Sequence, residues 1–336
     1  MTLTNRATLT TLSTRVVRIR EPGGPDHLET ADIDLADPGP GQIRVRQTAI
    51  GLNFIDIYQR SGLYPLPALP AVLGIEAAGV VEAIGPDVAE LAVGQRIAYA
   101  GEVGAYAAAR LLPAWRAVPV PAAIADSVAA TALARGITAH MLQTRIYAVG
   151  AESTVLVHSA AGGLGSLLVR FARRRGATVI GTVGSAAKAD IARAAGADHV
   201  IVGRDADFGR EVAALTGGAG VDVAYDGVGG DTLRRTLDCV RPFGTVASFG
   251  ESAGPIPPLA VEDLGPRRSL MLARPSVMRY MAEPAVYRLA AAEVLDAAAA
   301  GTAPTVGRAY PLEQAAAAHI DLESGATTGC ALLLPP

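Results

Sequence analysis

Cysteine and aromatic side chains are scarce in this chain of 336 residues, with two cysteines and 4% aromatics. The two thiols, Cys239 and Cys330, form neither a disulfide framework nor, without other ligands, a zinc site. Such cysteine usage favours a reducing, cytoplasmic setting. No apolar run approaches the roughly 20 residues that span a bilayer. A net charge of −3 gives no electrostatic reason to expect nucleic acid or an anionic membrane as a partner.

Acidic residues are absent from the N-terminal stretch MTLTNRATLTTLSTRVVRIR. Its threonine, serine and arginine content is faintly similar to that of an organellar transit peptide, but it lacks the apolar region of a secretory signal. We expect residues 1–15 to form a short flexible extension instead.

Two patterns of apolar residues divide the rest of the chain. From Val16 to Val120, short β-like runs are separated by glycine and proline turns, which predicts a β-rich unit. From Thr154 to about Gly250, apolar strands alternate with helical segments, which is typical of a doubly wound parallel sheet. The predicted fold class is therefore α/β, with a C-terminal piece that rejoins the first unit.

The stretch VLVHSAAGGLGSLLVRFARRRGATVIGTVGSAAK contains a glycine-rich turn between a strand and a helix. Ala160, Gly162 and Gly165 occupy the three small positions of a dinucleotide-binding fingerprint. Gly162 lets the backbone approach a pyrophosphate, and Gly165 lets the following helix pack closely on the strand. The N–H groups and the dipole of that helix favour the phosphates.

The second strand of this unit ends in GTVGSAAK, without the carboxylate that binds the ribose 2′-hydroxyl in NAD-dependent proteins. Ser185 and Lys188 instead offer a hydroxyl and a cation. A 2′-phosphate is attracted by a lysine and repelled by an acid, so the sequence favours NADPH. Lys188 also has an alternative interpretation as a solvated helix residue.

Together with the glycine turn, three further stretches closely resemble the quinone oxidoreductases (zeta-crystallin type) of the medium-chain dehydrogenase/reductase superfamily. They are GLNFIDIYQRSGLYP, LGIEAAGVVEAIGPDV and ARGITAHMLQ. The resemblance implies a GroES-like β-rich catalytic domain, at 16–136 and 275–336, around a Rossmann NADPH-binding domain at 137–274. It also implies a homodimer.

Zinc alcohol dehydrogenases of that superfamily have a cysteine where this chain has Asn53, and a histidine where it has Ile75. Neither Asn nor Ile replaces a ligand of tetrahedral zinc. The five histidines share no ligand-like spacing and are interpreted as surface or packing residues. We therefore expect no metal site, and a mechanism that depends on positioning an electron-poor acceptor.

The resemblance assigns Asn53, Tyr58 and Tyr64 to the catalytic cleft. Asn53 would donate a hydrogen bond to the nicotinamide or to an acceptor carbonyl, while the tyrosines supply flat faces and phenolic hydroxyls. The interpretation of the tyrosines as packing residues stays open. The expected cofactor-binding residues are Asn53, Thr138, Ala161, Gly162, Gly163, Leu164, Gly165, Thr182, Gly184, Ser185, Lys188, Arg204, Phe249 and Gly250.

Two positions depart from the family pattern around the adenosine. Relatives often have a tyrosine at Gly203 and a basic residue at Gly325, so both glycines weaken the expected phosphate site. Arg204 is a hypothetical substitute for the missing charge.

Three functions remain open from the sequence. The leading one is an NADPH-dependent oxidoreductase that transfers hydride or electrons to a small quinone. The second is a 2-enoyl reductase acting on an α,β-unsaturated carbonyl or thioester, which needs a proton donor such as Tyr58 or Tyr64. Arg267 and Arg268 would receive an acidic tail of such a substrate, or lie in a solvated loop. The third is an NADPH-binding structural or regulatory protein.

Overall fold

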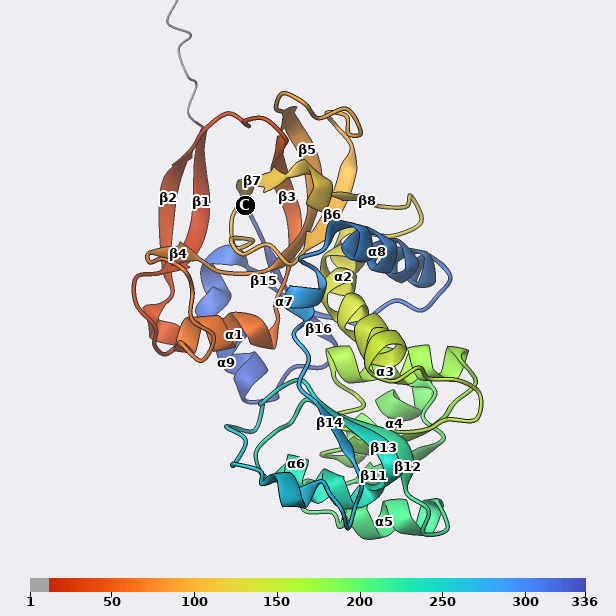
Figure 1. Ribbon diagram of the computed structural model, residues 1–336. Helices are drawn as coiled ribbons and strands as arrows, with labels where there is room; N and C mark the ends of the chain where they lie inside the picture. Colours follow the sequence, from red (N-terminus) through yellow and green to blue (C-terminus); the bar gives the residue numbers. More distant parts are fainter. Residues whose placement is uncertain (1–11) are drawn as a thin grey trace, which may run out of the picture. The chain divides into compact units, whose positions relative to one another are not determined.

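A computed structural model describes residues 12–336 of the protein. The chain forms two compact units, traced by colour in Figure 1. The first ends at Ala134 and is completed by Val306–Pro336, and the second is Arg135–Thr305. The first boundary falls within two residues of the expected one, whereas the second follows Thr305 rather than residue 274.

The first unit is built mainly on antiparallel strands. Its elements are β1 (Leu12–Ile19), β2 (Glu29–Leu35), β3 (Gln42–Gly51), α1 (Phe54–Ser61), β4 (Ala71–Val72), β5 (Glu76–Ile84), β6 (Arg96–Ala100), β7 (Ala109–Pro113), β8 (Val118–Pro119), β15 (Val306–Pro311), α9 (Ala315–Glu323) and β16 (Cys330–Leu334). A seven-stranded sheet has the order β15-β16-β3-β5-β6-β8, with β7 paired to β3, and a second sheet has the order β2-β1-β4. Because β16 pairs with β3, both parts of the chain build this unit.

The expected N-terminal extension lies largely outside the described residues. Residues 12–15 are not an extension, because β1 begins at Leu12 and pairs with β2 from that residue onward. Thr14 is buried, and its hydroxyl donates to the Ala109 carbonyl over 3.1 Å. Arg15 forms an ion pair with Asp32 at 2.6 Å.

The second unit holds an all-parallel sheet of order β11-β10-β9-β12-β13-β14. Its elements are β9 (Thr154–Val157), α3 (Gly163–Arg174), β10 (Thr178–Val183), α4 (Ala186–Ala195), β11 (His199–Val202), α5 (Phe208–Leu215), β12 (Val221–Asp226), α6 (Asp231–Thr236), β13 (Val240–Ser248), β14 (Met271–Ala273), α7 (Val277–Tyr280) and α8 (Pro284–Ala299). This is the strand order of a Rossmann sheet, so the predicted α/β fold class is confirmed.

Helix α8 explains why the second unit extends to Thr305. It follows the parallel sheet in the chain and packs on the C-terminal half of α2 (Asp126–Met141), where a Cβ at Gly136 would lie 2.4 Å from the Val294 side chain. His140 and Glu293 link the same two helices at 3.1 Å. Residues 284–299 therefore pack within this unit, although the sequence placed them with the β-rich one.

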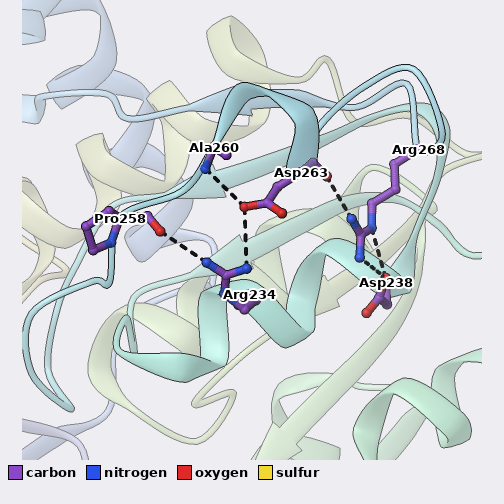
Figure 2. A network of polar contacts seen from close by, with 6 residues as sticks. All are labelled: Arg234, Asp238, Pro258, Ala260, Asp263 and Arg268. Atoms are coloured by element: carbon purple, nitrogen blue, oxygen red, sulfur yellow. Dashed lines mark hydrogen bonds and ion pairs between the residues drawn. The ribbon is translucent and has the colours of Figure 1, made fainter.

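A polar network secures the long connection between β13 and β14 (Figure 2). Arg234 on α6 donates to the Pro258 carbonyl at 3.1 Å and contacts Asp263 at 3.4 Å. Arg268 binds Asp238 at 2.7 Å and donates to the Asp263 carbonyl at 2.9 Å. Arg268 thus connects the loop to the Asp238 turn.

No helix within residues 12–336 is long and apolar enough to cross a membrane.

Candidate active site

The glycine-rich turn joins β9 to α3 in a conformation that requires small residues. Ser159 takes a positive φ of 52°, and α3 begins at Gly163 after Gly162 as N-cap. A Cβ at Gly165 would lie 2.1 Å from the Ser159 carbonyl oxygen, closer than any side chain tolerates. The turn therefore holds the start of α3 against the end of β9, as the fingerprint predicts.

The N-terminus of α3 has the features of a phosphate site. Gly162 provides no side-chain cap, so the N–H groups of the first helical turn have no partner within the helix and no cap from the preceding side chain. The apolar face of α3 is buried, which fixes the direction of the helix dipole. Gly162 itself is exposed while Ala161 is buried, so the backbone at Gly162 is open to a ligand. These residues fit a pyrophosphate.

The predicted adenosine-binding residues gather where β10 and β11 end. The Gly203 N–H donates to the Val183 carbonyl at 2.9 Å, which places Arg204 beside Gly184. A Cβ at Gly184 would lie 3.4 Å from Cγ of Arg204. Ser185 is the N-cap of α4, and Lys188 lies in the first turn of that helix. Two cations and a hydroxyl thus occupy the end of β10.

Gly203 has a structural reason for departing from the family pattern. Its φ of +123° lies in a region that residues with a Cβ rarely adopt. The tyrosine that the family resemblance implies at this position would need a different turn after β11. In this chain the turn instead presents Arg204, which is exposed.

The ends of β12 and β13 bring Phe249 and Gly250 against a second glycine turn. A Cβ at Gly227 would lie 2.5 Å from the Phe249 ring, and a Cβ at Gly250 would lie 2.7 Å from the Gly227 carbonyl. Asp226 stabilises this turn, because one carboxylate oxygen accepts the N–H groups of Val228 and Gly229 at 2.7 and 3.1 Å. Burial raises the pKa of Asp226. Sequence reasoning missed this residue, although YDGVGG contains it.

Thr138, the remaining residue of this unit that the sequence predicts to bind the cofactor, lies on α2 and is half-buried, whereas Ile137 and Ala139 beside it are fully buried.

The three expected catalytic residues lie in the first unit, on α1 and the loop that follows it. Asn53 directly precedes α1 and is 9% exposed. Its Nδ2 donates to Glu76 over 2.8 Å, and the other carboxylate oxygen of Glu76 accepts the Ala134 N–H over 2.8 Å. Glu76 is fully buried. It therefore fixes the orientation of the Asn53 amide, a role that sequence reasoning did not assign to it.

Tyr58 and Tyr64 form a pair within this unit. Their ring centroids lie 5.2 Å apart at 58°, and the Tyr64 N–H donates to the Tyr58 carbonyl at 2.9 Å. Tyr58 is nearly buried and Tyr64 is half-buried. The contact brings two flat apolar surfaces together at the C-terminal half of the helix that Asn53 precedes.

A buried polar chain connects the start of α1 with α9. The Asn53 N–H donates to Asp56 at 2.8 Å, and the same carboxylate oxygen accepts the Tyr106 hydroxyl at 3.0 Å. Tyr106 in turn contacts His319 Nε2 at 2.9 Å, and Arg60 contacts His319 Nδ1 at 3.2 Å.

Arg60 continues this chain to Glu323, with two bonds of 2.8 and 3.0 Å. Burial, together with the charge of Arg60, lowers the pKa of His319 to about 3, so the ring is neutral near pH 7. Nothing in the local sequence of Tyr106 or His319 indicates this connection, because its members come from distant segments.

A GroES-like β-rich unit and a parallel α/β unit with a dinucleotide-binding turn define a dehydrogenase/reductase of the medium-chain class. Models of two protein families match the chain: the alcohol dehydrogenase GroES-like domain at residues 39–122 and the zinc-binding dehydrogenase at residues 163–294. The chain belongs to the quinone oxidoreductase family of the medium-chain dehydrogenase/reductase superfamily.

Three relatives illustrate this membership. A 2-haloacrylate reductase of Burkholderia is 42% identical, and the match covers 94% of this chain and 98% of the relative. A quinone oxidoreductase of Pseudomonas aeruginosa is 41% identical over 93% of this chain and 97% of its own. The crystal structure of Escherichia coli quinone oxidoreductase complexed with NADPH has a TM-score of 0.91 and 40% identity, covering 96% of this chain and all of that one.

Proposed function

We propose that this protein is an NADPH-dependent oxidoreductase that reduces small quinones without zinc. The observation that carries the proposal is that two features occur together. Helix α3 starts at the glycine turn without a side-chain cap, and the end of β10 carries cations and no carboxylate. The first feature suits a pyrophosphate, and the second suits a 2′-phosphate. When bound, the cofactor supplies the hydride.

Lys188 and Arg204 would share the charge of the 2′-phosphate. The closeness of the Arg204 side chain to Gly184 supports this role, because Gly184 stands near the end of β10, where NAD-dependent proteins carry an acid. A glycine there leaves room for the phosphate and adds no negative charge. The NADPH complex of the E. coli relative supports the same choice of cofactor.

Asn53, Tyr58 and Tyr64 are proposed to orient the acceptor. Asn53 gives one N–H of its amide to Glu76, so the remaining N–H is the donor for a carbonyl. The tyrosine pair offers aromatic faces to a flat ring. Zinc is not required in this proposal, because a quinone accepts hydride readily and Asn53 and Ile75 supply no zinc-binding donor.

Reduction of an activated double bond is the second candidate function. It is favoured by the 42% identity to a 2-haloacrylate reductase. This reaction uses the same hydride and additionally needs a proton at the α-carbon. Tyr58 or Tyr64 would be the donor, directly or through a water molecule.

A homodimer is part of the proposal. The parallel sheet ends in β14, an edge strand with Met271 and Leu272 exposed by 53% and 36%. Phe243 in β13, which pairs with β14, is 73% exposed. An apolar edge of this kind is a template for pairing with a second copy. The two buried free thiols, Cys239 and Cys330, support a reducing, cytoplasmic location.

Oxidation of NADPH, followed by its absorbance, tests the proposed activity. Catalytic efficiency is measured for 1,4-benzoquinone and 9,10-phenanthrenequinone beside crotonyl-CoA and 2-haloacrylate, each repeated with NADH. We expect the quinones with NADPH to be the best pair. Preference for an enoyl compound would move the protein to the second function, and equal rates with NADH would contradict the roles of Lys188 and Arg204.

A further inference from the structure

His158 lies where β9 meets the glycine turn, and both of its ring nitrogens form hydrogen bonds. Nδ1 lies 2.9 Å from the Thr182 hydroxyl, and Nε2 lies 2.9 Å from the Thr236 hydroxyl. The ring is 4% exposed and packs edge-on against Phe208, with centroids 4.9 Å apart. His158 therefore connects the end of β10 with helix α6.

The hydrogen bonds of Thr236 determine which nitrogen of His158 carries the proton. The Thr236 hydroxyl donates to the Thr232 carbonyl over 2.7 Å, so its oxygen must accept from Nε2–H of His158. Burial lowers the pKa of His158 to about 4, and the positive charge of Arg235 acts in the same direction, so the ring is neutral near pH 7. A neutral ring protonated on Nε2 has a lone pair on Nδ1.

The hydroxyl of Thr182 consequently donates its only proton to His158 Nδ1. Its oxygen keeps lone pairs but has no proton for a ligand. A threonine hydroxyl ordinarily rotates to donate or accept, whereas this one is held as an acceptor.

Thr182 also lies between the two parts of the proposed cofactor site. Its carbonyl accepts the Ala160 N–H of the glycine turn at 3.0 Å, and the Ser185–Lys188 turn follows it two residues later. A nucleotide with its pyrophosphate at α3 and its 2′-phosphate near Lys188 must place its adenosine ribose between these groups. Thr182 is half-buried, so part of it reaches the surface between the glycine turn and the Ser185–Lys188 turn.

We propose that Thr182 accepts a hydrogen bond from the 3′-hydroxyl of the adenosine ribose, which is free in NADPH whereas the 2′-oxygen carries the phosphate, and that His158 is the positioning residue that holds Thr182 as an acceptor. The inference rests on the proposed NADPH-binding function. It assigns to a neutral threonine an acceptor role toward the ribose, comparable to the one that a carboxylate has toward the 2′-hydroxyl in NAD-dependent proteins. Because the threonine is uncharged, it accepts from the ribose without repelling a neighbouring 2′-phosphate.

Nucleotide binding, rather than turnover, tests this assignment. Bound NADPH is displaced by 5′-AMP, 2′-deoxy-AMP or 3′-deoxy-AMP, and the displacement is followed by NADPH fluorescence. In the wild type we expect 3′-deoxy-AMP to bind roughly fivefold more weakly than 5′-AMP, as is typical for the loss of one neutral hydrogen bond, whereas 2′-deoxy-AMP keeps the 3′-hydroxyl and is the control. In Thr182→Val this difference disappears, because the acceptor is removed while the shape is kept.

Two further variants separate positioning from folding. Thr178→Val alters the same strand at its exposed other end and should leave the discrimination between analogues unchanged. His158→Phe keeps an aromatic ring against Phe208 but releases the Thr182 proton, so the discrimination between 5′-AMP and 3′-deoxy-AMP should shrink while 5′-AMP still binds. Thermal melting of each variant shows whether it folds.

Equal binding of 5′-AMP and 3′-deoxy-AMP to the wild type would overturn the inference, as would unchanged discrimination in Thr182→Val. Failure of NADPH itself to bind would instead refute the proposed function. The two failures are therefore distinguishable in one experiment.

Discussion

Replacing Glu76 by glutamine should reduce both the stability of the first unit and its activity. Both oxygens of Glu76 accept N–H donors, from Asn53 and from Ala134, at 2.8 Å each. Glutamine has one acceptor oxygen, so its NH₂ group must face one of these two donors in a fully buried site. A buried donor left without a partner costs about 1–3 kcal/mol. For a unit of this size, that lowers the melting temperature by about 2–12 °C.

The activity should fall as well, since the Asn53 amide loses the contact that orients it. We expect kcat/KM for a quinone to decrease about tenfold in Glu76→Gln, equivalent to about 1.4 kcal/mol of transition-state stabilisation. Calorimetry and NADPH oxidation measure the two effects.

Glu82→Gln is the matched control for this substitution. Glu82 lies on the same strand, and its ion pairs with Arg44 and Arg46 are long, at 3.6 and 3.4 Å, and partly exposed. Its loss should cost less than about 0.5 kcal/mol. A Glu76→Gln protein that melts and reacts like Glu82→Gln would refute the positioning of Asn53 by Glu76.

Three further outcomes are expected. Gly165→Ala should cost about 1–3 kcal/mol, because its Cβ would meet the Ser159 carbonyl oxygen, and should weaken NADPH binding in a fluorescence titration. Lys188→Met should raise the KM for NADPH about tenfold and leave that for NADH unchanged. Lys188 is the only lysine of the chain, so it is the one side-chain amine that an acylating reagent modifies. NADPH should slow this acylation, whereas NADH should not. Acid should destabilise the fold, since the pKa of His158 is lowered to about 4 and that of His319 to about 3, below the unfolded value of about 6.5. The unfolded chain then binds protons that the native one does not. The free energy of unfolding should decrease toward pH 4, and His319→Gln should reduce the slope by about 1.4 kcal/mol per pH unit in urea titrations.

The division into a β-rich unit and a parallel α/β unit was predictable because both depend on local patterns. Alternating apolar residues specify strands with one buried face, and apolar strands separated by helices specify a parallel sheet. The placement of α8 was not predictable in this way. Its contact with Gly136 joins two helices far apart in the chain, and no local pattern encodes which partner a helix covers.

The histidines show the same limit. Their spacing predicted no common site, and the sequence interpreted them as surface or packing residues. The sequence did not indicate that His158 forms a hydrogen bond with a threonine 78 residues away, or that His319 forms one with a tyrosine 213 residues away. Which nitrogen of His158 carries the proton depends on a hydrogen bond that Thr236 makes within helix α6.

By itself, the sequence determined the conformation of the glycine turn, the chemical character of the end of β10 and the family of the protein. These features depend on neighbouring residues, because the absence of a Cβ at Gly165 and of a carboxylate after Val183 acts within a few bonds of the backbone. Tertiary structure alone decided how Asn53 and Thr182 are oriented. Their partners Glu76 and His158 come from other segments of the chain, and a hydrogen bond between buried groups exists only once folding has brought donor and acceptor together.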